Sequence, residues 1–185
     1  MGFGLIVAKL NSYIYRWYWA SRPFSLTASI VPVLLGSSLA FSDGKWDMLS
    51  FSLIMMGSIL VQIGTNLVDE YADDARAERE EKLIAPYKVI ALGLLSHQSV
   101  RAGAIFCFGL ATCIGIYLTF KVGWPILAIG LVSLLVAYCY SAGPIPLGSL
   151  ALGEVVVFIF MGPIMVGGTY YVYTKSFSVE TFVMS

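Results

Sequence analysis

Apolar residues form five long stretches along the chain, each close to the roughly 20 residues that an α-helix needs to cross the hydrocarbon core of a bilayer. Turn-forming segments such as SDGKWD and SAGPIPLGS separate most of these stretches. The pattern predicts an all-α protein, a polytopic transmembrane helix bundle that forms a single domain over residues 1–185. The predicted spans cover about 25–41, 48–68, 99–120, 124–141 and 151–173.

The composition agrees with a membrane protein whose principal surroundings are the lipid bilayer. Hydrophobic residues make up 58% of the chain and charged residues only 12%, and the formal net charge is zero. This balance is far from that of a soluble domain. Without an excess of basic residues, the chain as a whole has no electrostatic attraction for nucleic acid, and no nucleic-acid partner is expected.

The basic residues are distributed unevenly between the two sides of the predicted membrane. One side carries the N-terminal segment, the long polar break between the second and third spans, and eight of the eleven basic residues. Cytoplasmic loops of membrane proteins are enriched in lysine and arginine. We therefore expect a multi-pass protein of the cell membrane with its N-terminus and its acidic loop in the cytoplasm.

The stretch QIGTNLVDEYADD, residues 62–74, places polar side chains where the second span ends. At 100° per residue, one helix face carries Gln62, Asn66, Asp69, Glu70 and Asp73. Carboxylates so close together repel one another unless a cation lies among them. Mg²⁺, which prefers oxygen ligands and is usually completed by substrate phosphate, suits such a set. The alternative is an ordinary solvated face at the start of a cytoplasmic loop.

Four blocks of the chain resemble the UbiA superfamily of intramembrane prenyltransferases, and most closely its 1,4-dihydroxy-2-naphthoate polyprenyltransferase branch in menaquinone biosynthesis. The blocks are ASRPFSLTASIVPVLLGSSLA, QIGTNLVDEYADD, KVIALGLLSHQSVRAG and YSAGPIPLGSLALGEVVVFIFMGPIMVGGTYYV. The resemblance implies an enzyme that binds a polyprenyl diphosphate through Mg²⁺ at two acidic motifs. The allylic C–O bond ionises, and an aromatic quinone precursor attacks the resulting carbocation, with loss of the naphthoate carboxylate.

The same resemblance assigns roles to the acidic stretch. The two acids of the family's first motif correspond to Glu70 and Asp73, and Asp69 stands where the motif has an asparagine. A longer Glu side chain can still reach a metal ion. The resemblance therefore implies metal ligation by Glu70, Asp73, Asp69 and Asn66.

Basic residues around this motif are expected to contact the diphosphate, and the candidates are Lys88, Arg22 and Arg76. Each has an alternative interpretation. Arg22 and the following proline can simply mark the start of a span, and Arg76 can belong to a solvated, positively charged loop. Tyr138 and Tyr140 could line a cavity and stabilise a carbocation through their ring faces, or act as interfacial anchors.

The chain departs from the family pattern in one major respect, because it lacks the second half of the family fold and the second acidic motif. It is therefore expected to be the N-terminal portion of a longer enzyme, or a shortened relative that needs a partner chain, and to be inactive alone. The alternative function is a non-catalytic membrane protein that binds isoprenoid diphosphate or divalent ions. The prenyl chain length follows from none of these features.

Overall fold

A computed structural model describes residues 13–76, 85–141 and 152–185, and within these ranges the regular structure is entirely helical. The prediction of an all-α transmembrane bundle is confirmed. In chain order the helices are α2 (Tyr13–Ala20), the 3₁₀ turn η1 (Pro23–Leu26), α3 (Thr27–Ser42), α4 (Met48–Arg76), α5 (His97–Val122), α6 (Trp124–Ser141), α7 (Leu152–Ile159), the π-helical turn η3 (Phe160–Ile164), α8 (Met165–Thr174) and α9 (Val179–Val183).

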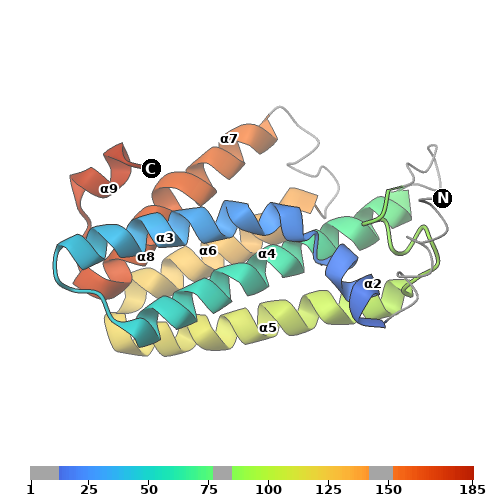
Figure 1. Ribbon diagram of the computed structural model, residues 1–185, viewed down its shortest axis with the longest axis horizontal. Coiled ribbons are helices and arrows are strands. Elements are labelled where there is room, and N and C mark those ends of the chain that lie inside the picture. The colour runs from blue at the N-terminus through green and yellow to red at the C-terminus, as the bar shows by residue number, and fades with distance from the viewer. Residues whose placement is uncertain (1–12, 77–84, 142–151) are drawn as a thin grey trace.

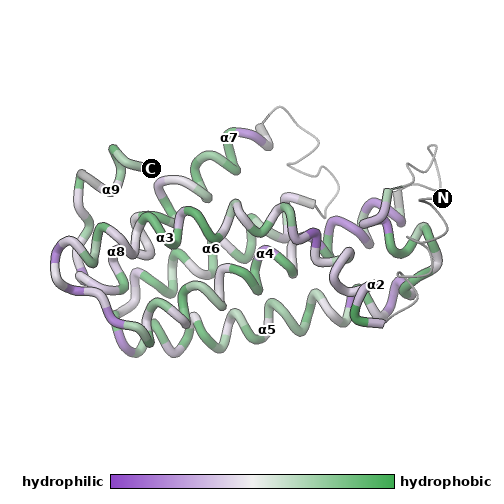
Figure 2. The backbone as a smooth tube through the Cα atoms, viewed as in Figure 1, coloured by the Kyte–Doolittle hydropathy of each residue, from purple (hydrophilic) through white to green (hydrophobic). Residues whose placement is uncertain are grey.

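The long helices α3, α4, α5 and α6 run side by side along the length of the molecule (Figure 1). Helix α4 packs mainly against α5, and it also contacts α3 and α6, while α8 packs against α3. Hydrophilic residues gather at the two ends of these helices, and the middle is apolar (Figure 2). This distribution is the one expected of a bundle whose middle lies in hydrocarbon and whose ends meet water.

Each of the five predicted spans corresponds to a helical segment, and the protein is a multi-pass membrane protein. Four segments are long and apolar enough to cross a bilayer: Pro23–Ser42, Met48–Ala75, His97–Val122 and Gly153–Thr174. The predicted span at 124–141 is also an apolar helix, but it is shorter, at Trp124–Tyr140. The second predicted span covers 48–68, and the helix that contains it, α4, extends without a break to Arg76.

The last span is interrupted where its sequence contains a glycine followed by a proline. Gly162 leaves helical geometry, with φ −91° and ψ −106°, and Pro163 lies inside the π-helical turn η3. Proline has no N–H to donate and its ring clashes with the preceding turn, so the α-helical pattern cannot continue unchanged through it. In Figure 1, α7 diverges from α3.

The loop that leads into α5 folds back over the end of α4. Val89 and Leu95 of this loop are buried in one apolar cluster with Leu67 and Val68 of α4 and with Ala20. Arg16 of α2 also donates a hydrogen bond to the carbonyl of Leu94 at 3.0 Å. The end of α4 is therefore enclosed by the α2–η1 corner on one side and by this loop on the other.

Candidate functional site

The predicted polar stripe lies on the continuous helix α4 and faces the protein interior at its centre. Glu70 is 1% exposed and Asn66 is 6% exposed. The side chains of Asp69 and Asp73 are more accessible, at 26% and 38%. A helix carries these residues on one face because their spacings are three and four. The stripe is therefore not the ordinary solvated face that the alternative interpretation requires.

Two basic residues that are distant in sequence form ion pairs with these acids. Arg22, from the α2–η1 corner, donates a hydrogen bond from Nη1 to Asp69, and its Nη2 lies 3.6 Å from Oε2 of Glu70. Lys88, from the loop before α5, is hydrogen bonded to Asp73, and its Nζ lies 3.9 Å from the same oxygen of Glu70. Glu70 thus lies between the two cations. The structure brings the predicted residues Arg22 and Lys88 together with the acids.

The third predicted contact to diphosphate, Arg76, is the last residue of α4, and its side chain lies outside the described part of the structure. Residues 77–84 also lie outside it. Of the two tyrosines, Tyr140 lines a cavity, whereas Tyr138 is 49% exposed.

Several buried polar atoms at this site have no hydrogen-bond partner. Oε1 of Glu70 accepts a hydrogen bond from the N–H of Ile90 at 3.1 Å, but Oε2 accepts none. Nε and Nη2 of Arg22 are likewise buried and donate no hydrogen bond. Leaving such groups unsatisfied is costly, and buried polar groups in native proteins are almost always paired. A ligand with oxygen atoms would satisfy the donors of Arg22, and a cation would satisfy Oε2 of Glu70.

The acids fit a divalent cation only as part of a shared site. Among the described residues, no three acidic, histidine or cysteine side chains converge in a way that would hold a metal ion alone. Glu70 and Asp73 nevertheless share one cation, the ammonium of Lys88. Mg²⁺ is commonly held by one or two carboxylates together with substrate phosphates and water. The donor set fits such an ion when a phosphate-bearing ligand completes the shell.

Four neighbouring contacts did not follow from the sequence pattern. The ring of Tyr87 lies 4.9 Å from the Arg22 guanidinium carbon and packs edge-on against Phe24. Asn66 donates hydrogen bonds to the carbonyl of Ser21 and to Oγ of Ser25. In the sequence, Tyr87 is marked only by its position next to Lys88, and serines in a turn have no distinctive pattern. Neither Tyr87 nor the two serines could therefore be identified as site residues without the tertiary contacts.

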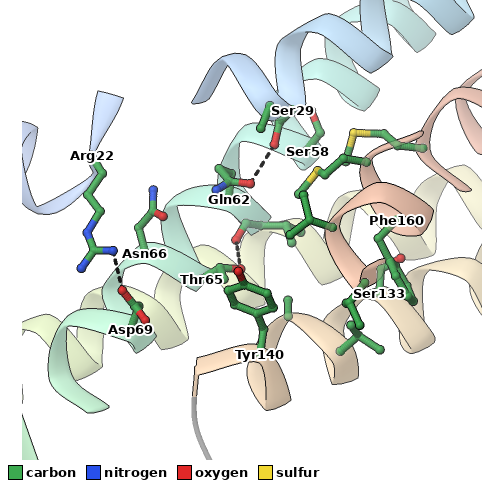
Figure 3. A pocket seen from close by; sticks show the side chains of 18 residues that line it. Arg22, Ser29, Ser58, Gln62, Thr65, Asn66, Asp69, Ser133, Tyr140 and Phe160 are labelled. Atoms are coloured by element: carbon green, nitrogen blue, oxygen red, sulfur yellow. Dashed lines mark hydrogen bonds and ion pairs between the residues drawn. The ribbon is translucent and has the colours of Figure 1, made fainter. Parts of the chain in front are cut away.

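A cavity of about 320 Å³ extends from Arg22 and Asp69 into the bundle between α3, α4, α6 and the α7–η3 region. Figure 3 shows Gln62, Asn66 and Asp69 along one wall, with Ser29 donating a hydrogen bond to Gln62, and Tyr140 and Phe160 on the other side. Most of the remaining lining is apolar: Ala28, Val61, Val136, Ala137, Val156, Val157, Met161 and Met165. The cavity is therefore charged at one end and apolar along its length.

Comparison of the sequence with known proteins identifies a matching family and several similar proteins. Residues 29–185 match the UbiA prenyltransferase family. The chain is 31% identical to the 1,4-dihydroxy-2-naphthoate octaprenyltransferase of Bacillus subtilis, over 89% of this chain and 53% of the relative. It is 26% identical to the protein of the same name from Haemophilus influenzae, over 90% and 57%. A 2-carboxy-1,4-naphthoquinone phytyltransferase of Synechocystis is 26% identical, over 88% and 52%.

The chain spans about half the length of these curated relatives. The matched region contains almost all of α3 and the whole of α4 to α9, together with Glu70, Asp73 and Lys88. Arg22 lies just before the family match, but within the described structure.

Proposed function

Because this chain belongs to the UbiA prenyltransferase family, we propose that it acts in the transfer of a polyprenyl group from a polyprenyl diphosphate to an aromatic acceptor. The acceptor we propose is 1,4-dihydroxy-2-naphthoate, because relatives with that substrate in their names are similar over most of this chain. Diphosphate, prenylated ring and carbon dioxide are the expected products, since the acceptor's carboxylate is lost as the new C–C bond forms. The prenylated ring would be an intermediate in menaquinone biosynthesis.

One observation carries the proposal: the ion pair of Arg22 and Asp69 lines one end of a largely apolar cavity inside a membrane bundle, and Glu70 and Lys88 lie next to that ion pair. A polyprenyl diphosphate has the matching division, with an anionic head and a long apolar tail. The head requires cations and hydrogen-bond donors. The tail requires surroundings that exclude water. A purely polar solute would leave the apolar part of the cavity without matching contacts, and a purely apolar solute would leave the charged end without them.

In this proposal Arg22 and Lys88 contact the diphosphate oxygens, and Arg76 is a further candidate. Arg22 has donors in place, because its Nε and Nη2 are buried without a hydrogen bond. Lys88, which is hydrogen bonded to Asp73, would give up part of this contact to bind the diphosphate oxygens. Asp69 would keep Arg22 oriented through their ion pair.

Members of this family generally use a divalent metal ion, and we propose Mg²⁺, held by Glu70 and Asp73 with further oxygens from Asp69 or Asn66. When bound, the ion stabilises the negative charge that develops on the departing diphosphate. Glu70 is suited to this role because its Oε2 is buried and accepts no hydrogen bond. Its other oxygen is fixed by the N–H of Ile90.

The apolar section of the cavity would protect the reactive carbocation from water. Tyr140 and Phe160 line this section (Figure 3). Aromatic ring faces attract cations, and the attraction grows in a desolvated site. We propose that these rings stabilise the allylic cation while the acceptor approaches.

The test is prenyl transfer by the chain in lipid nanodiscs with MgCl₂, radiolabelled geranylgeranyl diphosphate and 1,4-dihydroxy-2-naphthoate. Because the chain spans about half the length of its relatives, the expected result is binding of the labelled diphosphate that is lost when EDTA is present. Prenylated product, extracted into organic solvent, would show that the chain is also active alone. Matched reactions contain the Glu70→Gln variant. If the chain neither forms product nor binds the labelled diphosphate in filter assays, the proposed function is wrong.

A second candidate function is binding of isoprenoid diphosphate or divalent ions without chemistry. It is favoured by the ion pairs in the site, because the acids are already neutralised by Arg22 and Lys88, and no metal-holding group of three appears among residues 13–76, 85–141 and 152–185. Prenylated product from this chain in the same nanodiscs would exclude this function.

A further inference from the structure

The backbone of Arg22 is in the left-handed region, with φ 50° and ψ 66°. In the described part of the chain, only Lys175 shares a positive φ among residues other than glycine. This conformation costs free energy for a residue with a side chain, and it persists only where neighbouring contacts enforce it. At Arg22 it turns the chain between α2 and η1 and points the guanidinium at Asp69 and Glu70.

The contacts that enforce this corner come from Asn66 on α4. Its Nδ2 donates hydrogen bonds to the carbonyl oxygen of Ser21 at 2.7 Å and to Oγ of Ser25 at 2.8 Å. Ser25 in turn donates from its N–H and from its Oγ to the carbonyl oxygen of Arg22, both at 2.9 Å. One buried amide therefore holds the residues on both sides of Arg22. We call Asn66, Ser21 and Ser25 the Asn66 clamp.

We propose that Asn66 is a positioning residue, which holds Arg22 in its left-handed conformation so that the guanidinium faces the diphosphate position. This inference rests on the proposed function of Arg22. The positioning role requires the N–H₂ group of Asn66, because its Nδ2 donates both hydrogen bonds, to Ser21 and to Ser25. A metal ligand at this position would need the amide oxygen instead. An aspartate keeps oxygen donors for a metal but cannot donate the two hydrogen bonds, so Asn66→Asp separates the two roles.

The test is equilibrium binding of tritiated farnesyl diphosphate, with MgCl₂, to the chain in lipid nanodiscs. The variants are Asn66→Asp, Arg22→Lys and the double substitution. Losing the clamp should weaken binding about tenfold in the protein that retains Arg22, the effect expected from about two hydrogen bonds. Lysine cannot present the planar fork that the clamp orients. In the Arg22→Lys background, Asn66→Asp should therefore change the affinity less than about twofold.

Ser25→Ala gives a second measure that leaves every candidate metal ligand in place. It removes one clamp contact, so about threefold weaker binding is expected when Arg22 is present and no change in the Arg22→Lys background. This variant decides the question if Asn66→Asp does not yield a monodisperse protein. Unchanged affinity, or an equal loss in both backgrounds, would overturn the inference. If Arg22→Lys itself binds as tightly as the unaltered chain, the proposed role of Arg22 is wrong, which is a different failure.

Discussion

Glu70 is the residue on which the charge balance of the site depends. It is a buried acid with Arg22 and Lys88 at 3.6 and 3.9 Å from the same oxygen. Burying three charges together is tolerable only when they compensate one another, and removing one leaves the others uncompensated. An arrangement with cations on both sides of one carboxylate can exchange partners when a charged ligand enters. Glu70 therefore contributes both to the stability of the fold and to the capacity of the site for a phosphate ligand.

Neutralising either of the proposed metal ligands should reduce metal-dependent turnover. Glu70→Gln keeps an oxygen for the N–H of Ile90 but loses the charge. Asp73→Asn likewise keeps the shape of the side chain. We expect each to lower the apparent affinity for Mg²⁺ about tenfold or more, which is the scale found when metal-site groups are altered. Magnesium titrations of prenyl transfer or diphosphate binding measure the effect, and unchanged titration curves for both variants would contradict the metal assignment.

Lys88 should matter for diphosphate affinity, whereas a second ion-paired lysine should not. Lys88→Met removes a cation that reaches Glu70 and Asp73. Loss of a charge-assisted contact to phosphate should weaken prenyl diphosphate binding about tenfold or more. The matched control is Lys121→Met, because Lys121 also pairs with a carboxylate, Asp47. Equal losses of affinity in the two variants would point to a general effect of charge.

At the scale of elements, the continuity of α4 creates the site. The helix extends over Met48–Arg76, so it carries the polar stripe from inside the bundle to its end without a break. The predicted span ended at residue 68 because hydropathy falls there. Backbone hydrogen bonding continues regardless of hydropathy, and the α2–η1 corner and the loop before α5 cover the polar turns. The acids are therefore held on a rigid helix.

Close approach of α3 and α8 depends on Gly36. A Cβ built at Gly36 would lie 2.6 Å from the carbonyl oxygen of Val166 and 2.8 Å from the side chain of Thr169. Since the nearest atom belongs to a backbone, Gly36→Ala should separate the helices and destabilise the protein by about 1–3 kcal/mol. Gly109→Ala is the control, because a Cβ added there would meet no atom within 4 Å. Unfolding midpoints in detergent measure both, and equal midpoints would exclude the packing role of Gly36.

Asp47 should make the opposite end of α4 sensitive to acid. Burial acts to raise the pKa of Asp47, but hydrogen bonds from Ser50 and the nearby charge of Lys121 outweigh it, so that the pKa lies below its ordinary value of 3.8. A lowered pKa in the folded state contributes stability above the ordinary value, and this contribution is lost as pH falls through the folded value.

The measurement compares the unaltered chain with Asp47→Asn in thermal unfolding from pH 6 to pH 3. Asparagine can still accept the hydrogen bond that the N–H of Ser50 donates to Asp47. The stability difference between the two proteins should therefore be largest near pH 6 and shrink toward pH 3. A difference that is constant over this range would show that the charge of Asp47 contributes nothing.

At the scale of the whole molecule, the orientation in the membrane remains a prediction from the distribution of basic residues. It places the diphosphate site on the cytoplasmic side, where Ala91 of the loop before α5 also lies. In a chain whose native cysteines are replaced, Ala91→Cys should react with a membrane-impermeant maleimide only after the membrane is opened. Ser176→Cys, at the opposite end, should react in intact cells. The reverse labelling pattern would contradict the predicted orientation.

The sequence by itself determined the helical class, the approximate spans and the polar face of α4, because these follow from hydropathy and from helical periodicity, which are local properties. Only the tertiary structure decided how the charges pair. Arg22 and Lys88 lie 47 and 15 residues from Asp69 and Asp73, their hydrogen-bonded acids. No local spacing encodes those contacts, because they depend on how the α2–η1 corner and the loop before α5 fold over α4. The same folding made Asn66 a hydrogen-bond donor to the corner that carries Arg22.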